Sequence, residues 1–255
     1  MAGHGVAVGL AGLRKTYDGH AVLRGLDLAV DPGELLAIVG QSGEGKSVLL
    51  RQIVGLERPD AGTITVGGVP LPRYLAMAPD EKPFRIAMVF QNAALLASLT
   101  VAENVGLRLR ERRRHDEREI RAITRRVLEQ VELAGTEDKM PAELSGGMRK
   151  RVAIARALAI DPELILYDEP TADLDPILTE QIGNLIRRIK ATRGSTQLIV
   201  THNLPLARAI ADRIAVLEAG RIADCRTPEA LAESRHPLTR ELLRASGLGL
   251  EERPC

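Results

Sequence analysis

Apolar residues follow two different spacings along this chain. In residues 6–30 they alternate loosely with polar residues, which predicts short antiparallel strands. Four short and almost continuous apolar runs predict buried strands: residues 35–39, 85–90, 163–168 and 197–201. Apolar residues three to four positions apart predict helices between and after these strands: residues 46–55, 100–133, 145–159, 176–191 and 204–212.

The remaining segments complete the predicted order of elements. They are a strand, a proline-rich connector, a hairpin and a helical tail: residues 63–66, 70–83, 213–223 and 228–245. Because strands that alternate with helices are joined by right-handed crossovers, we expect an α/β fold with a mostly parallel, doubly wound sheet. The N-terminal strands form a separate antiparallel β subdomain. Ligands of such sheets bind at the carboxyl ends of the strands, and four candidate residues follow such ends: Gly40, Gln91, Asp168 and His202.

Composition narrows the class of protein. The 255 residues are 45% hydrophobic, enough for one large domain with a subdomain. A net charge of +1, 2% aromatic residues and the absence of tryptophan argue against binding to nucleic acid. Cys225 and Cys255 form neither a disulfide framework nor a metal cluster, which favours a reduced compartment. We expect no signal peptide and no membrane span, so if the chain works at a membrane, another polypeptide must hold it there.

The basic run at residues 108–114 allows two interpretations. It could be a nucleic-acid patch, but acidic residues follow it at 116, 117 and 119. Interleaved charges at helical spacing favour a solvated helix face instead.

A glycine-rich loop supplies the clearest chemistry. Residues 40–47 match the G-x-x-x-x-G-K-[ST] pattern between a strand and a helix, and the loop and its next residue are Gly40, Gln41, Ser42, Gly43, Glu44, Gly45, Lys46, Ser47 and Val48. The backbone N–H groups of such a loop surround a polyphosphate, and the helix N-terminus faces it. Lys46 would reach the β- and γ-phosphates, and the Ser47 hydroxyl would be a ligand of Mg²⁺. The alternative is a plain glycine-rich connector, which the strand–loop–helix context disfavours.

Polar residues at the other strand ends supply what nucleotide hydrolysis needs besides a phosphate loop. Asp168 is positioned to hold Mg²⁺, and Glu169 to accept a proton from the attacking water or to fix its position. Gln91 and His202 could contact the metal and the γ-phosphate. Each residue alone could simply cap a strand, but their joint occurrence favours a site.

Over nearly its whole length the chain resembles the ATP-binding subunit of an ABC transporter. The most specific mark is Leu-Ser-Gly-Gly-Met at residues 144–148, which matches the LSGGQ signature except at Met148. The resemblance implies that the following correspond in turn to Walker A, the Q-loop, Walker B, the catalytic carboxylate, the D-loop, the switch histidine and the adenine-stacking aromatic: residues 40–47, Gln91, residues 164–168, Glu169, residues 172–175, His202 and Tyr17.

The resemblance also implies how the protein works. ATP and Mg²⁺ would be its ligands, with Ser47, Gln91 and Asp168 at the metal. Ser145, Gly146 and Gly147 would complete the site of a second copy of the chain. We expect a phosphate-loop, RecA-like ABC domain over residues 1–240, an inserted helical subdomain over residues 91–158 and a tail over residues 241–255. The dimer would lie beneath membrane permease subunits, at the cytoplasmic face of the bacterial inner membrane.

Smaller features suggest a branch of the family. Val48, Met148 and the aliphatic Ile177 look most like ATPases of Mla-type lipid transport systems, which work with an Mce-domain lipid-binding protein. Two features depart from the usual pattern: Asp173 replaces the usual Gly or Ala of the D-loop, and residues 107–111 lack a proline.

Three other functions are open at this point. The first is an importer ATPase for amino acids or another small solute. The second is a soluble ABC ATPase in DNA repair or translation, a class that usually has tandem nucleotide domains, a coiled coil or zinc-type cysteines. The third is a small-molecule kinase, which would leave the signature and His202 unexplained.

Overall fold

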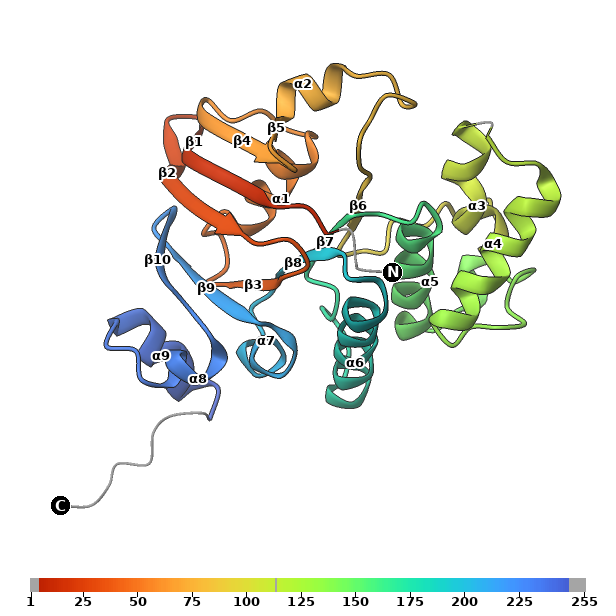
Figure 1. The fold of residues 1–255 in the computed structure, drawn as a ribbon. Helices are drawn as coiled ribbons and strands as arrows, with labels where there is room; N and C mark the ends of the chain where they lie inside the picture. Colours follow the sequence, from red (N-terminus) through yellow and green to blue (C-terminus); the bar gives the residue numbers. More distant parts are fainter. Residues whose placement is uncertain (1–4, 113, 248–255) are drawn as a thin grey trace.

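The computed structural model describes residues 5–112 and 114–247. Figure 1 shows an antiparallel sheet beside a mostly parallel sheet, with three helices gathered on the side of the parallel sheet that is away from the antiparallel one. These are α3 (Val101–Arg112), α4 (Glu117–Gln130) and α5 (Gly146–Ala159). The arrangement confirms the predicted fold class, including the N-terminal antiparallel sheet and the inserted helices.

The antiparallel sheet has the order β2-β1-β4-β5. Its strands are β1 (Val8–Tyr17), β2 (His20–Val30), β4 (Ala61–Val66) and β5 (Val69–Pro70). β1 and β2 contain 10 and 11 residues, so the prediction of short strands here was wrong. Register shifts interrupt the β1–β2 pairing, and each shift breaks the alternation of apolar residues, so one long strand reads as two short ones.

The segment predicted as a proline-rich connector contains a short helix, α2 (Leu71–Ala76). Pro72 lies in its first turn, where a missing N–H group costs no hydrogen bond. Tyr74 of α2 stacks on Phe84, with ring centroids 4.6 Å apart. The segment predicted as a connector is therefore helical over these six residues.

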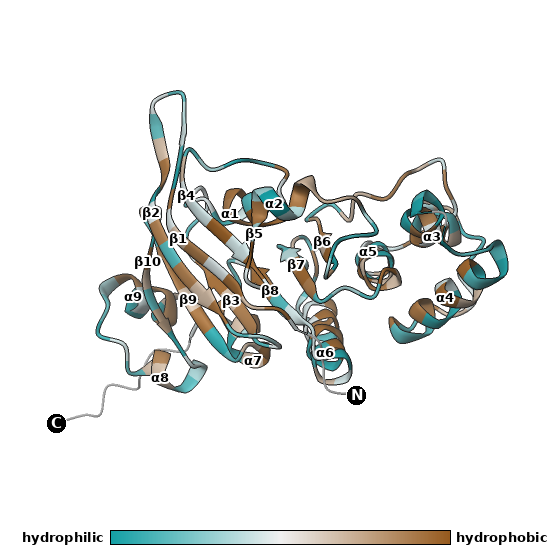
Figure 2. Cartoon of the chain, turned by 45° about the horizontal axis from the view of Figure 1, so that its top comes forward, coloured by the Kyte–Doolittle hydropathy of each residue, from teal (hydrophilic) through white to brown (hydrophobic). Residues whose placement is uncertain are grey.

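The second sheet carries the strand ends that the sequence singles out. Its order is β10 (Arg221–Arg226), β9 (Arg213–Glu218), β3 (Leu35–Val39), β8 (Thr196–Val200), β7 (Leu164–Asp168) and β6 (Ile86–Val89). All neighbours are parallel except β10 and β9, which form the predicted hairpin. β3 is buried throughout because Leu36 and Ile38 pack into one apolar cluster while Leu35 and Val39 pack into the other. In Figure 2 the central strands are mainly brown and the outward parts of α4 are teal.

The helical pattern over residues 100–133 is divided between α3 and α4. Asp116 caps the N-terminus of α4 and so marks where the second helix begins. Its side chain accepts a hydrogen bond from the Glu119 N–H, and the Glu119 carboxylate accepts one from the Asp116 N–H. Arg110 at the end of α3 pairs with Glu117 of α4 at 2.9 Å. This exposed ion pair agrees with the solvated helix face predicted for the basic run.

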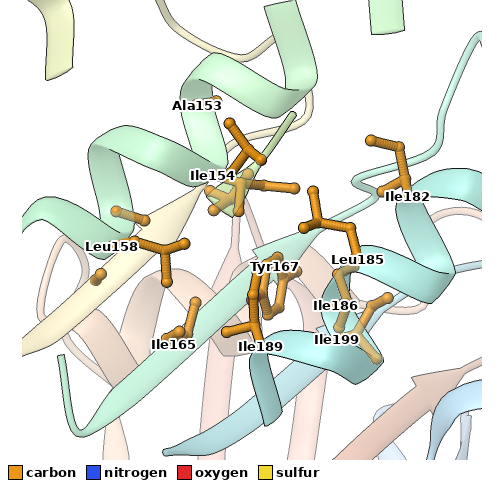
Figure 3. Packing of buried hydrophobic residues seen from close by; sticks show 14 of the residues in the cluster. Ala153, Ile154, Leu158, Ile165, Tyr167, Ile182, Leu185, Ile186, Ile189 and Ile199 are labelled. Atoms are coloured by element: carbon orange, nitrogen blue, oxygen red, sulfur yellow. The ribbon is translucent and has the colours of Figure 1, made fainter. Parts of the chain in front are cut away.

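The core between α5, β7 and α6 (Pro176–Arg193) determines where the signature lies. Figure 3 shows side chains from these elements and from β8 packed together, and those labelled are Ala153, Ile154, Leu158, Ile165, Tyr167, Ile182, Leu185, Ile186, Ile189 and Ile199. Tyr167 is fully buried, and burial raises the pKa of its hydroxyl. Because α5 packs on β7, Ser145 at the start of α5 and Asp168 at the end of β7 are supported by the same core.

The remaining α-helices pack around the parallel sheet, and two of them lie near the C-terminal end of the described chain. They are α1 (Lys46–Val54), α7 (Leu204–Ile210), α8 (Pro228–Ala232) and α9 (Pro237–Ala245). Leu243 of α9 is 4% exposed and belongs to the main core, so α9 is packed against the domain. Within the part of the chain that the structure describes, no helix is both long and apolar enough to cross a membrane.

Candidate functional site

The phosphate loop joins β3 to α1 and depends on its glycines. Gly43 and Gly45 have φ values of 86° and 95°, in the left-handed region that side chains disfavour. A Cβ on Gly40 would lie 2.5 Å from the Leu217 carbonyl oxygen, so only glycine fits there. The loop therefore adopts its curved form because of its sequence, as the motif predicts.

Lys46 folds back on this loop. Its Nζ donates to the carbonyl oxygens of Gly40 and Gln41, both at 2.8 Å, and the residue is 8% exposed. Burial lowers the pKa of the Lys46 ammonium group, whereas the carboxylates of Glu169 and Glu44 act in the opposite direction. A buried ammonium group that neutral carbonyls stabilise only in part has a strong attraction for a polyphosphate.

Ser47 and Asp168 meet beneath the loop. The Ser47 hydroxyl donates to Asp168 Oδ1 at 2.7 Å, although the two residues are 121 positions apart. Asp168 is 7% exposed; burial raises the pKa of its carboxyl group, and the bond from Ser47 lowers it. These hard oxygen donors suit Mg²⁺. Among the described residues no group of three His, Cys, Asp or Glu side chains could hold a metal by itself, so phosphate oxygens and water would have to complete the shell.

Glu169 and His202 come together at the ends of β7 and β8. The Glu169 Oε2 atom lies 3.0 Å from His202 Nδ1 and accepts from the His202 backbone N–H at 3.4 Å. Glu169 is only 9% exposed and has φ 44°, a strained value that its N–H bond to the Val200 carbonyl helps to maintain. The carboxylate is thus held in place at the cleft by two neighbouring strands.

An open cleft of about 470 Å³ collects most of the predicted residues. Its lining is Tyr17, Val22, Ser42, Gly43, Gly45, Lys46, Ser47, Val48, Gln91, Glu169 and His202. Val22 was not predicted; its only sequence signal is its position in the alternating pattern of β2. Gln41 and Glu44 lie in the same loop. Asp168 does not line the cleft itself but accepts a hydrogen bond from Ser47, which does.

Tyr17 stands at the edge of the cleft and is 38% exposed. Its hydroxyl donates to the Glu57 carboxylate, and Lys15 Nζ lies 5.3 Å from its ring centroid. Burial raises the pKa of the Tyr17 hydroxyl, and the bond to Glu57 acts in the same direction. Lys15 and Glu57 contact this ring, and neither was predicted. Glu57 is 40 positions from Tyr17 in the chain, and Lys15 is a neighbour in β1 with no distinguishing pattern of its own.

The structure does not bring the signature residues into this cleft. Ser145 caps α5, and its hydroxyl accepts from the Met148 N–H at 3.3 Å. A Cβ on Gly147 would lie 3.3 Å from Leu178 at the start of α6, and Asp173 in the preceding loop has φ 63°. Aspartate is among the side chains that tolerate the left-handed region, so it can stand where Gly is usual.

Comparison with known proteins identifies the class. The sequence pattern of the family described as ABC transporter matches residues 23–172. The chain therefore belongs to the ABC transporter family, and it is the ATP-binding subunit of such a transporter and an ATPase.

Individual relatives cover most of the chain. The L-cystine transport system ATP-binding protein TcyN of Escherichia coli is 42% identical, over 93% of this chain and 97% of that protein. The "Probable ribonucleotide transport ATP-binding protein mkl" of Mycobacterium leprae is 38% identical, over 96% of this chain and 71% of that protein. The methionine import ATP-binding protein MetN of Ralstonia nicotianae is 43% identical, over 89% and 64%.

A solved structure is similar in fold as well. The ATP-binding cassette MJ0796, in a dimeric post-hydrolysis state bound to ADP and Pi, is 33% identical, with a TM-score of 0.77 over 87% of this chain and 98% of that one.

Proposed function

We propose that this ATPase forms a dimer around ATP and powers phospholipid transport through a partner permease. The observation that carries the dimer is the separation of two halves within one chain. Lys46, Ser47 and Glu169 line one cleft, whereas Ser145 lies outside it. A helix N-terminus such as that of α5 attracts phosphate, so the signature of one copy can close the cleft of another. The dimeric form of the similar cassette MJ0796 supports this arrangement.

Within the closed site, each side chain has a distinct task. Tyr17 stacks on the adenine, Lys46 neutralises the β- and γ-phosphates, and Glu169 takes the proton of the attacking water. Gln91 and His202 contact the γ-phosphate from two strand ends. Ser145, Gly146 and Gly147 of the other copy donate to the same phosphate.

Ser47 and Asp168 would hold Mg²⁺, with Gln91 at its edge. The ion would neutralise phosphate charge as the bond to the leaving group breaks. The carboxylate of Asp168 is already desolvated in this structure, so a cation beside it would relieve the cost of burial.

We place the dimer at the cytoplasmic face of the bacterial inner membrane as a peripheral subunit beneath two permeases. Residues 1–240 would be the ATP-binding domain, residues 91–158 its helical subdomain and residues 241–255 a tail. The proposal of a phospholipid cargo and of an Mce-domain partner depends on the resemblance of Val48, Met148 and Ile177 to Mla-type ATPases. The second candidate is an importer ATPase for a small solute, which the near-complete match to TcyN favours.

A mixed dimer tests the shared site. Ser145→Arg should abolish hydrolysis because the bulky cation blocks the approach of the neighbouring phosphate. A dimer of one Ser145→Arg chain and one Lys46→Ala chain contains one undamaged composite site and one doubly damaged site. Mixing the two inactive chains should therefore restore activity, measured as phosphate release. If the mixture stays as inactive as each chain alone, the proposal of a shared site is wrong.

The cargo is tested by isolating the complex. The Glu169→Gln chain, purified with Mg-ATP from detergent-solubilised native membranes, should bring its partners for identification by mass spectrometry. A multi-span permease with an Mce-domain protein is the expected result. A permease with a soluble solute-binding protein would instead support the importer, and the absence of any membrane protein would contradict both.

A further inference from the structure

Arg156 of α5 makes a bidentate contact with the loop that follows β6. Its Nη1 donates to the Ala94 carbonyl oxygen at 2.6 Å, and its Nη2 donates to the Ala93 carbonyl oxygen at 2.8 Å. Among the described residues these oxygens are its hydrogen-bond partners. Burial lowers the pKa of Arg156, and no carboxylate contributes to that shift. A half-buried guanidinium group is therefore dedicated to two consecutive peptide groups.

These two peptide groups belong to an unfavourable turn. Ala93 and Ala94 have φ values of 61° and 46°, so two consecutive alanines occupy the left-handed region. Alanine enters this region at a cost in free energy, and such a conformation persists only where its surroundings impose it. The Ala93 methyl group is buried in the main core, whereas Ala94 is exposed. Arg156 donates to the carbonyl oxygen of each residue of the turn, including that of the exposed Ala94.

The same loop has a second attachment to α5, next to the cleft. Lys150, 7% exposed, donates from Nζ to the Gln91 carbonyl oxygen. The Gln91 side chain lines the cleft. α5 thus holds the backbone of residues 91–94 from two points, while its own N-terminus begins at the signature.

We propose that Arg156 is a positioning residue for ATP hydrolysis, which holds the strained Ala93–Ala94 turn. Through this turn it sets the position of Gln91 relative to the signature helix. Within one copy, Gln91 faces that copy's own ATP and the signature faces the ATP of the other copy, so the contacts to α5 make these two groups move as one unit. This inference rests on the proposed function, because it assumes that Gln91 and the signature both act on ATP.

The test replaces Arg156 with methionine, which removes both donors and keeps an apolar stem. We expect kcat of the purified chain to fall about tenfold, since two charge-assisted bonds are lost, while KM for ATP changes less than about twofold because the phosphate loop is intact. Amide hydrogen exchange in residues 91–100 should become faster.

A second substitution separates this role from a general loss of stability. Glycine adopts the left-handed region without support, so Ala94→Gly in the Arg156→Met chain should restore kcat to within about threefold of the original chain. Arg193→Met is the matched control, because Arg193 also donates to a carbonyl, that of Leu158, and pairs with Asp161 at 2.8 Å. This control lies outside the cleft lining and should leave kcat unchanged.

The outcomes are distinct. An unchanged kcat in Arg156→Met overturns the inference, and so does a low kcat that Ala94→Gly does not raise. If the chain does not dimerise with ATP and the Lys46→Ala chain hydrolyses ATP at the normal rate, the proposed function itself fails.

Discussion

Replacing Lys46 with alanine is expected to lower the rate of ATP hydrolysis at least about 100-fold, because a preorganised positive charge at the phosphates is lost. In this structure the ammonium group is buried and bonded to the carbonyls of Gly40 and Gln41. The measurements are steady-state phosphate release and the binding of a fluorescent ATP analogue. The affinity for this analogue should also fall.

A surface lysine provides the control for this change. Lys190 of α6 pairs with Asp212 and lies outside the cleft lining. Lys190→Ala removes the same charge from the chain, so its activity should equal that of the unmodified protein. Thermal unfolding of both variants checks that the fold is intact. Full hydrolysis by a folded Lys46→Ala chain would disprove the site.

Glu169→Gln is expected to separate ATP binding from hydrolysis. A general base contributes about 10²- to 10⁴-fold to rate, and glutamine cannot accept the proton. The amide oxygen can still accept from His202, so the geometry of the pair at 3.0 Å is retained. Removal of a buried negative charge near Lys46 also weakens the repulsion of phosphate. The variant should therefore accumulate as a dimer with Mg-ATP, measured by size-exclusion chromatography with light scattering.

Glu163 gives a matched control at the opposite end of β7. Its carboxylate pairs with Arg85 at 2.9 Å, away from the cleft. Glu163→Gln makes the same chemical change and should cost some stability but no catalytic rate. A Glu169→Gln chain that hydrolyses ATP at the normal rate, or stays monomeric with Mg-ATP, would exclude the assigned role.

Some features of the site could be predicted because they depend only on residues that are neighbours in the sequence. The loop over residues 40–47 has Gly43 and Gly45 in the left-handed region that most side chains disfavour, and the run at residues 35–39 is apolar because both faces of β3 are covered. The helix start at Ser145 likewise has its own cap. In each case the residues that determine the conformation are adjacent in the chain.

The misread elements have a common cause. Bulges interrupt the alternation of apolar residues in β1 and β2, so these strands look short in the sequence. The prolines around α2 indicate a connector, although Pro72 lies in the first turn of the helix. Local pattern does not distinguish an interruption from an end, since the distinction depends on what the segment packs against.

By itself the sequence determined the phosphate loop, the order of strands and helices and the acidic end of β7, since spacing and backbone preference specify these without distant contacts. Only the tertiary structure decided how they meet. It places Glu169 against His202, Ser47 on Asp168 and Arg156 on the turn after β6, and it keeps Ser145 away from the cleft. These contacts join segments far apart in sequence, and only the packing of α5 and the neighbouring strands brings them within hydrogen-bond distance.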